Sequence, residues 1–124
     1  MDDFSEIEIN PFICYYAISI TALVNVLTMN VGVLKLHLRL PENLSLKGKR
    51  QELKSIIAQL RNQFNISAAE VADNDLWQLA TIAVCVVSND QRFSNEVLSK
   101  VVNLVESGRF DIELLDYKVE INPL

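Results

Sequence analysis

Leucine alternates with basic residues along one short segment, and this alternation constrains the fold more than any other feature of the chain. The apolar residues occupy every second position, with basic side chains between them: Leu34, Leu36, Leu38 and Leu40 alternate with Lys35, His37 and Arg39. A period of two is typical of a strand that packs one face on a core and leaves the other face open. The segment is therefore predicted to be a half-buried strand that ends at Pro41-Glu42-Asn43.

The next segment repeats its apolar residues at the spacing of a helix. Ser45 suits the N-cap position, and Phe64-Asn65 closes the repeat. Between them one apolar stripe is formed by Leu46, Leu53, Ile56, Ile57 and Leu60. We therefore expect a helix that buries this stripe.

Two further strands and a tight connection follow. Residues Ile66 to Val71 and Leu79 to Val87 are rich in apolar and β-branched side chains. The connection contains Ala72-Asp73-Asn74-Asp75, which are residues that favour turns. This combination predicts a hairpin.

A second helix is predicted from the spacing of Ser88 and Gln91, which is that of a capping box. Its apolar face is expected to consist of Phe93, Val97, Leu98, Val101, Leu104 and Val105. Gly108 then acts as a helix stop. The last strand is expected from Phe110 to Ile121, and a slip of the apolar phase at Leu114-Leu115 predicts a bulge there.

The predicted order is β-α-β-β-α-β, which is the ferredoxin-like split βαβ arrangement of the α+β class, an antiparallel sheet with two helices on one face. One core is expected between sheet and helices, formed by Leu36, Leu38, Leu53, Ile56, Leu60, Ile82, Val84, Val97, Val101 and Leu104. This fold carries enzymes, regulators and nucleic-acid binders alike, so it does not choose a function.

Five short motifs carry a resemblance to a known family. They are Ser45-Leu46-Lys47-Gly48-Lys49-Arg50, Ala69-Glu70-Val71, Asp75-Leu76-Trp77-Gln78, Val86-Val87-Ser88-Asn89-Asp90 and Glu113-Leu114-Leu115-Asp116-Tyr117. Over roughly residues 29 to 121 the chain resembles the bacterial YlxP-like family, a family of unknown function. The resemblance implies the same fold and a gene neighbourhood of translation-initiation and ribosome-maturation genes. Gly48 departs from the family, which tends to carry an acidic residue there.

Residues 1–28 differ from the domain at 29–124. They carry four acids and no base, and residues 11–28 form an uncharged run just long enough to span a bilayer. A signal peptide would need a positive start, and the run contains Asn25 and several hydroxyl groups, so a membrane is not the favoured partner. We interpret the segment as an apolar extension, either an added element or a start site placed before the natural one at Met29.

Catalytic and metal-binding patterns are missing from the sequence. Cys14 and Cys85 are far apart and are expected to be buried free thiols of a cytoplasmic protein. His37 is the only histidine and is interpreted as a surface residue. The carboxylates of Asp73, Asp75, Asp90 and Asp116 suit turns and caps better than a cation site. We expect no enzymatic activity, no cofactor, no metal and no small-molecule substrate.

Basic residues are concentrated in one part of the chain. Residues 35 to 61 hold seven bases against two acids, whereas residues 62 to 124 hold four bases against ten acids. At 100° per residue four bases share one side of the first helix, and two more project from the first strand: Lys47, Arg50, Lys54 and Arg61, with Lys35 and Arg39. Such a surface suits phosphate backbones, although a solvated helix side is the simpler interpretation.

A second candidate surface is the corner formed by Asp75, Trp77 and Gln78. Tryptophan beside a turn could anchor a partner, but capping the end of the core is the favoured interpretation.

Two binding hypotheses therefore remain, together with a third in which the protein is an enzyme. The first is an accessory factor that binds RNA or a ribosomal particle through the basic residues. The second is a protein-interaction or homodimer module that uses the open sheet face, where Thr81, Ala83, Cys85 and Val87 form a nearly apolar strip.

Overall fold

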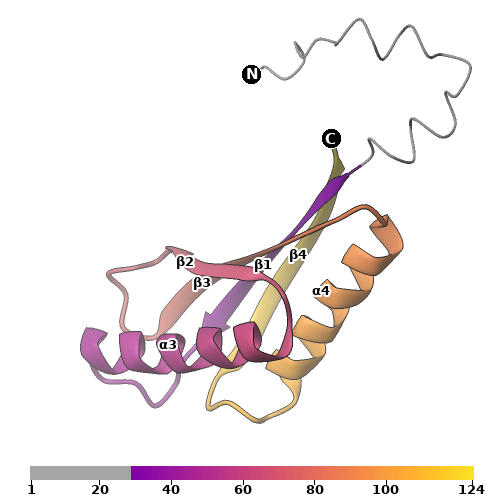
Figure 1. The fold of residues 1–124 in the computed structure, drawn as a ribbon. Coiled ribbons are helices and arrows are strands. Elements are labelled where there is room, and N and C mark those ends of the chain that lie inside the picture. Colours follow the sequence, from indigo (N-terminus) through magenta and orange to yellow (C-terminus); the bar gives the residue numbers. More distant parts are fainter. Residues whose placement is uncertain (1–28) are drawn as a thin grey trace, which may run out of the picture.

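The computed structural model describes residues 29–124, and every structural statement below concerns this part of the chain. Its elements follow one another as β1 (Asn30–Arg39), α3 (Leu46–Gln63), β2 (Ser67–Ala72), β3 (Leu79–Ser88), α4 (Gln91–Glu106) and β4 (Glu113–Pro123). The predicted β-α-β-β-α-β order is confirmed (Figure 1). The interpretation of residues 1–28 as an extension lies outside the described residues. No helix within 29–124 is both long and apolar enough to cross a membrane.

The four strands form one antiparallel sheet in the order β2-β3-β1-β4. Both helices cover the same face of this sheet, because the buried side chains of α3 and α4 belong to the same core cluster as those of the strands (Figure 1). Within residues 29–124 no helix covers the other face. This arrangement confirms the ferredoxin-like fold.

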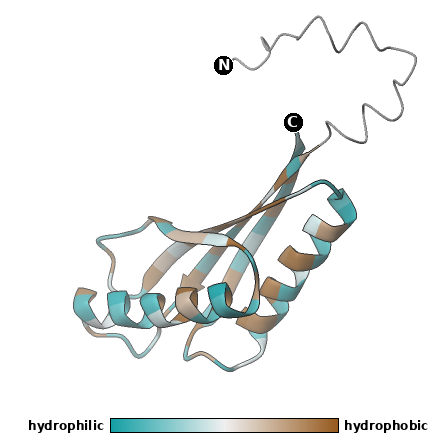
Figure 2. Ribbon diagram, viewed as in Figure 1, coloured by the Kyte–Doolittle hydropathy of each residue, from teal (hydrophilic) through white to brown (hydrophobic). Residues whose placement is uncertain are grey.

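The core consists of the alternating leucines of β1 and the apolar stripes of the two helices. Figure 2 shows the apolar residues of α4 gathered on the side that turns toward the sheet. Eight of the ten predicted core residues are buried: Leu36, Leu38, Leu53, Ile56, Leu60, Ile82, Val84 and Val101. The other two, Val97 and Leu104, are partly buried and pack against this core. The leucine alternation therefore places one face of β1 in the core, as predicted.

The bulge predicted in the last strand is present. His37 of β1 lies opposite Asp116 of β4, whereas the next residue, Leu38, lies opposite Leu114. Leu115 is therefore the extra residue, and it exposes half of its surface. The strand itself begins at Glu113, three residues later than predicted, although Phe110 is buried against the core.

The predicted capping box at the start of α4 is wrong. The N-cap is Asp90, whose side chain accepts a hydrogen bond from the Arg92 amide at 2.9 Å. The Ser88 hydroxyl instead donates to the Asp90 carbonyl oxygen at 2.8 Å and contacts the Ser94 hydroxyl at 2.6 Å. Asp90 takes the cap because Ser88 still belongs to β3.

The buried face of α4 is also rotated from the predicted one. Phe93 is half exposed, whereas its neighbour Ser94 is completely buried. The Ser94 hydroxyl donates to Asn30 Oδ1 at 2.6 Å, which ties the helix to the beginning of β1. The buried position is therefore occupied by a serine with a hydrogen-bond partner, whereas hydrophobicity alone predicted that the phenylalanine would be buried.

Candidate nucleic-acid interface

Four bases of α3 form one exposed surface along the side of the helix. We call this set the basic surface: Lys47, Arg50, Lys54 and Arg61. The helix begins at Ser45, whose side-chain oxygen accepts from the Gly48 amide at 3.0 Å, so the predicted N-cap is confirmed. The helical phase that buries Leu53, Ile56 and Leu60 places the four bases beside the core stripe, where they stay in solvent.

The basic surface borders a groove of about 400 Å³ between α3 and β2. Three bases and one acid line it, namely Arg50, Lys54, Arg61 and Glu70, and its remaining lining is apolar: Leu53, Ile57, Ala58 and Ala68. The charged residues of the groove therefore carry a net positive charge, while most of its exposed surface is apolar.

Arg61 is held in place at one end of the groove. Its Nη2 donates to the Ala68 carbonyl oxygen at 2.8 Å, so the side chain bridges the last turn of α3 and the edge strand β2. A guanidinium group has five N–H donors. Most of its donors therefore remain for a ligand, while the bridge reduces the conformational entropy that binding would cost.

Lys35 and Arg39 lie on the open face of the sheet, on the far side from the helices. Their alternation with the buried Leu36 and Leu38 requires this placement. Arg39 also forms an exposed ion pair with Glu113, with Nε and Oε1 3.1 Å apart. The structure therefore divides the six predicted bases into the four on α3 and the two on β1, which belong to different surfaces.

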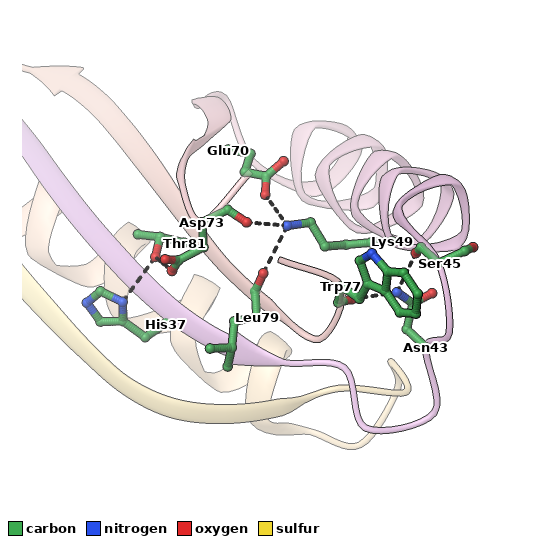
Figure 3. Close-up of polar contacts among 9 residues, drawn as sticks. All are labelled: His37, Asn43, Ser45, Lys49, Glu70, Asp73, Trp77, Leu79 and Thr81. Atoms are coloured by element: carbon green, nitrogen blue, oxygen red, sulfur yellow. Dashed lines mark hydrogen bonds and ion pairs between the residues drawn. The ribbon is translucent and has the colours of Figure 1, made fainter. Parts of the chain in front are cut away.

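Lys49, which was not among the predicted site residues, is buried completely. Its Nζ pairs with Glu70 Oε2 at 2.8 Å and donates to the carbonyl oxygens of Asp73 at 2.6 Å and Leu79 at 2.9 Å (Figure 3). Two of the three ammonium donors thus make hydrogen bonds to these carbonyl oxygens, and the Glu70 carboxylate supplies the opposite charge. The helical phase gives the signal, because at 100° per residue position 49 falls within the apolar stripe that contains Leu53 and Ile56.

A hydrogen-bond chain joins the β2–β3 turn to β1 beside this lysine. Thr81 Oγ1 donates to Asp73 Oδ2 at 2.8 Å and lies 3.2 Å from His37 Nδ1 (Figure 3). Because the Thr81 hydrogen is directed at Asp73, the hydroxyl oxygen accepts from His37 Nδ1–H. His37 is half buried on the open face, as its alternation predicts, and the chain fixes its ring orientation. Asp73 belongs to the β2–β3 turn, where its backbone has a φ of 63°.

The Asp75, Trp77 and Gln78 corner is anchored by its polar groups while its indole ring is exposed. Asn43 Nδ2 donates to the carbonyl oxygens of Trp77 and Ser45 (Figure 3). Gln78 Nε2 donates to the Asn43 carbonyl oxygen at 3.1 Å. Trp77 exposes 55% of its surface, so the interpretation that it caps the core is wrong. Asp75 is exposed beside it.

The absence of a side chain at position 48 has a local steric reason. A Cβ atom at this position would lie 2.5 Å from the Asn43 side-chain oxygen, so the loop before α3 packs directly on the helix backbone. The acidic side chain that the family resemblance implies here would have to displace Asn43.

The other chemical expectations concern metals and thiols. Within residues 29–124 no three His, Cys, Asp or Glu side chains are grouped so that they could hold a metal ion. Cys85 is a free thiol and is half buried, on the open face of β3. Cys14 lies outside the described residues.

Comparison with known proteins places this domain in a family. Residues 31–119 match the family described as "Protein of unknown function (DUF503)". The uncharacterized protein YlxP of Bacillus subtilis (strain 168) is 33% identical over 63 residues, which cover 51% of this chain and 68% of that protein.

Solved structures are similar only in fold. The de novo designed protein Foldit4 is 11% identical, with 77% of this chain and 96% of that chain covered and a TM-score of 0.43. AtUAH in complex with (S)-hydroxyglycine is also 11% identical, with 77% and 28% covered and a TM-score of 0.47. The match over residues 31–119, together with the similarity to YlxP, establishes that the chain belongs to the YlxP-like DUF503 family of proteins of unknown function.

Proposed function

We propose that this domain is a non-catalytic accessory factor that binds structured RNA or a ribosomal particle through the basic surface of α3. The observation that carries the proposal is the grouping of Lys47, Arg50, Lys54 and Arg61 on one side of one helix beside a groove with three basic lining residues. The gene neighbourhood that the family resemblance implies supports a link to translation. Binding of this kind is a cytoplasmic role and requires no cofactor.

Phosphate groups are the part of RNA that this surface would contact. Four bases along a helix side can each neutralise a phosphate and release its counterion, which favours association at low salt. Arg61, already held by Ala68, would present its remaining donors to phosphate oxygens without further ordering.

Readout of base sequence is not part of the proposal. Single-stranded RNA is commonly read by aromatic side chains that stack on bases across a sheet. The pairing register gives the open face of the two central strands only Val31, Val33, Lys35, His37, Arg39, Leu79, Thr81, Ala83, Cys85 and Val87, none of which is aromatic. We therefore expect recognition of backbone shape and charge.

Reversing two charges of the basic surface should weaken RNA binding roughly tenfold or more at low salt, because two phosphate contacts become repulsive. For about four phosphate contacts, log affinity of the unmodified protein should fall with log salt at a slope of roughly −3 to −4. A fluorescence titration of ribosomal RNA and of purified ribosomal subunits measures both quantities for the full chain and for Arg50→Glu/Lys54→Glu.

The matched control reverses two exposed bases elsewhere on the domain, Lys100→Glu/Arg109→Glu, with the same change in net charge. This variant should bind nearly as well as the unmodified protein and keep most of its salt slope. Equal losses in the two variants would show that only net charge matters. Absence of binding by the unmodified protein at low salt would remove RNA as the partner.

A further inference from the structure

The two edges of the sheet differ in how well they are protected against pairing with another strand. The β2 edge is only six residues long, contains a register shift between Glu70 and Ala72, and has its Ala68 carbonyl oxygen occupied by Arg61. Short, bulged and covered edges are the usual protection against association. The β4 edge is 11 residues long, and its bulge at Leu115 lies near the beginning, which leaves residues 116 to 123 regular.

The backbone groups that β4 presents outward can be identified from one hydrogen bond. The Leu124 amide donates to the Met29 carbonyl oxygen at 2.8 Å, so the backbone of Leu124 faces β1. In an antiparallel pair this orientation alternates with every residue. The N–H and C=O groups of Tyr117, Val119 and Ile121 therefore point away from β1, and because β4 ends the sheet, no strand of residues 29–124 pairs with them.

The side chains of this edge carry charges that the described domain leaves uncompensated. Lys118 lies directly opposite Lys35 on β1, and like charges at opposite positions destabilise a sheet. Glu120 lies opposite Val33. Within residues 29–124 neither Lys118 nor Glu120 forms an ion pair. An additional strand with the opposite charge order would therefore improve the electrostatics of β4.

We propose that β4 pairs with β4 of a second copy of this chain, antiparallel about a twofold axis at Val119, to form one continuous sheet across a homodimer. In this register Lys118 lies opposite Glu120 of the partner subunit, and Glu120 lies opposite the partner's Lys118. Tyr117, whose side chain is 47% exposed, lies opposite the partner's Ile121. The outward groups of Val119 and Ile121 and the Tyr117 carbonyl oxygen then gain backbone partners. The Tyr117 amide, which donates to Asp116 Oδ1 at 2.8 Å, exchanges that contact for the partner strand.

Other twofold registers of the β4–β4 pair are less favourable. An axis at Lys118 or at Glu120 places identical charges opposite each other, which costs free energy. An axis at Tyr117 brings the bulged Leu115 opposite Val119 of the partner subunit and interrupts the ladder. The axis at Val119 is thus the register that combines regular backbone with opposite charges.

Charge reversal at positions 118 and 120 tests the proposal on the full chain. We expect sedimentation equilibrium to show a dimer for the unmodified protein. Lys118→Glu and Glu120→Lys should each weaken dimerisation roughly tenfold or more, since both symmetric ion pairs become repulsive. An equimolar mixture of the two variants should regain a dimer, because each then offers the other opposite charges at both positions.

This design separates loss of association from loss of folding. Lys118→Glu replaces a like-charge pair with Lys35 by an opposite-charge pair, so the folded monomer should keep its thermal stability. Val71→Glu on the β2 edge is the control, and it should dimerise normally. A monomer at all concentrations up to the sub-millimolar range, unchanged dimerisation of both single variants, or failure of the mixture to recover would each overturn the proposal.

Discussion

Replacing Lys49 with methionine should lower the free energy of unfolding by about 3–5 kcal/mol, which is the usual cost of breaking a buried ion pair from one side. The substitution leaves the Glu70 carboxylate, which is 16% exposed, without its partner. It also removes the donor from the carbonyl oxygens of Asp73 and Leu79. Urea unfolding followed by circular dichroism measures the loss.

Two further variants show whether the loss comes from the pair itself. Lys47→Met makes the same change on the exposed side of α3 and should alter the free energy of unfolding by less than about 0.5 kcal/mol. In Lys49→Met/Glu70→Leu no carboxylate remains to be compensated, so the double variant should lose clearly less than the sum of its single substitutions. Additive losses would show that Lys49 and Glu70 do not stabilise each other.

Replacing Leu60 with alanine should cost about 2–5 kcal/mol, the range for a buried leucine whose cavity cannot collapse completely. Leu60 is fully buried in the core shared by α3 and the sheet. The same measurement applies, with Leu44→Ala as the control, because Leu44 exposes 77% of its surface and should be nearly neutral. A loss below 1 kcal/mol at Leu60 would contradict its place in the core.

Features that depend on local periodicity could be predicted from the sequence. The leucines of β1 alternate for long enough that only one face can be buried, and this determines which side the helices cover. The bulge at Leu115 could be predicted because one extra residue in β4 shifts the apolar phase. Ser45 could be predicted as an N-cap because it directly precedes the apolar repeat that begins at Leu46.

Features that depend on tertiary contacts could not be predicted in the same way. Helical phase places Lys49 in the apolar stripe, but its partners, Glu70 and the turn carbonyls, are distant in the sequence and could not be predicted. Ser88 and Asp90 both suit an N-cap, and the length of β3 decides between them. Trp77 was expected to cover the core because it is large and apolar, but the corner is anchored by Asn43 and Gln78, which leaves the ring in solvent.

Lys35 and Arg39 show the same limitation for the candidate site. They carry the same charge as the α3 bases, and the prediction included them in one RNA-binding set although they project from the strand. Strand alternation turns them to the open face, while the helix lies on the other. Deciding which charged residues share a surface therefore requires the sheet topology as well as the sequence.

The contacts of Lys49 have a consequence for how the domain opens locally. A single ammonium group links the first half of α3 to β2, to the β2–β3 turn and to the beginning of β3. These segments cannot separate without leaving a charge and two carbonyl oxygens without partners in the core, which is costly. The hairpin turn, although exposed, is therefore held to the helix, and moving it away requires the same cooperative unit to open.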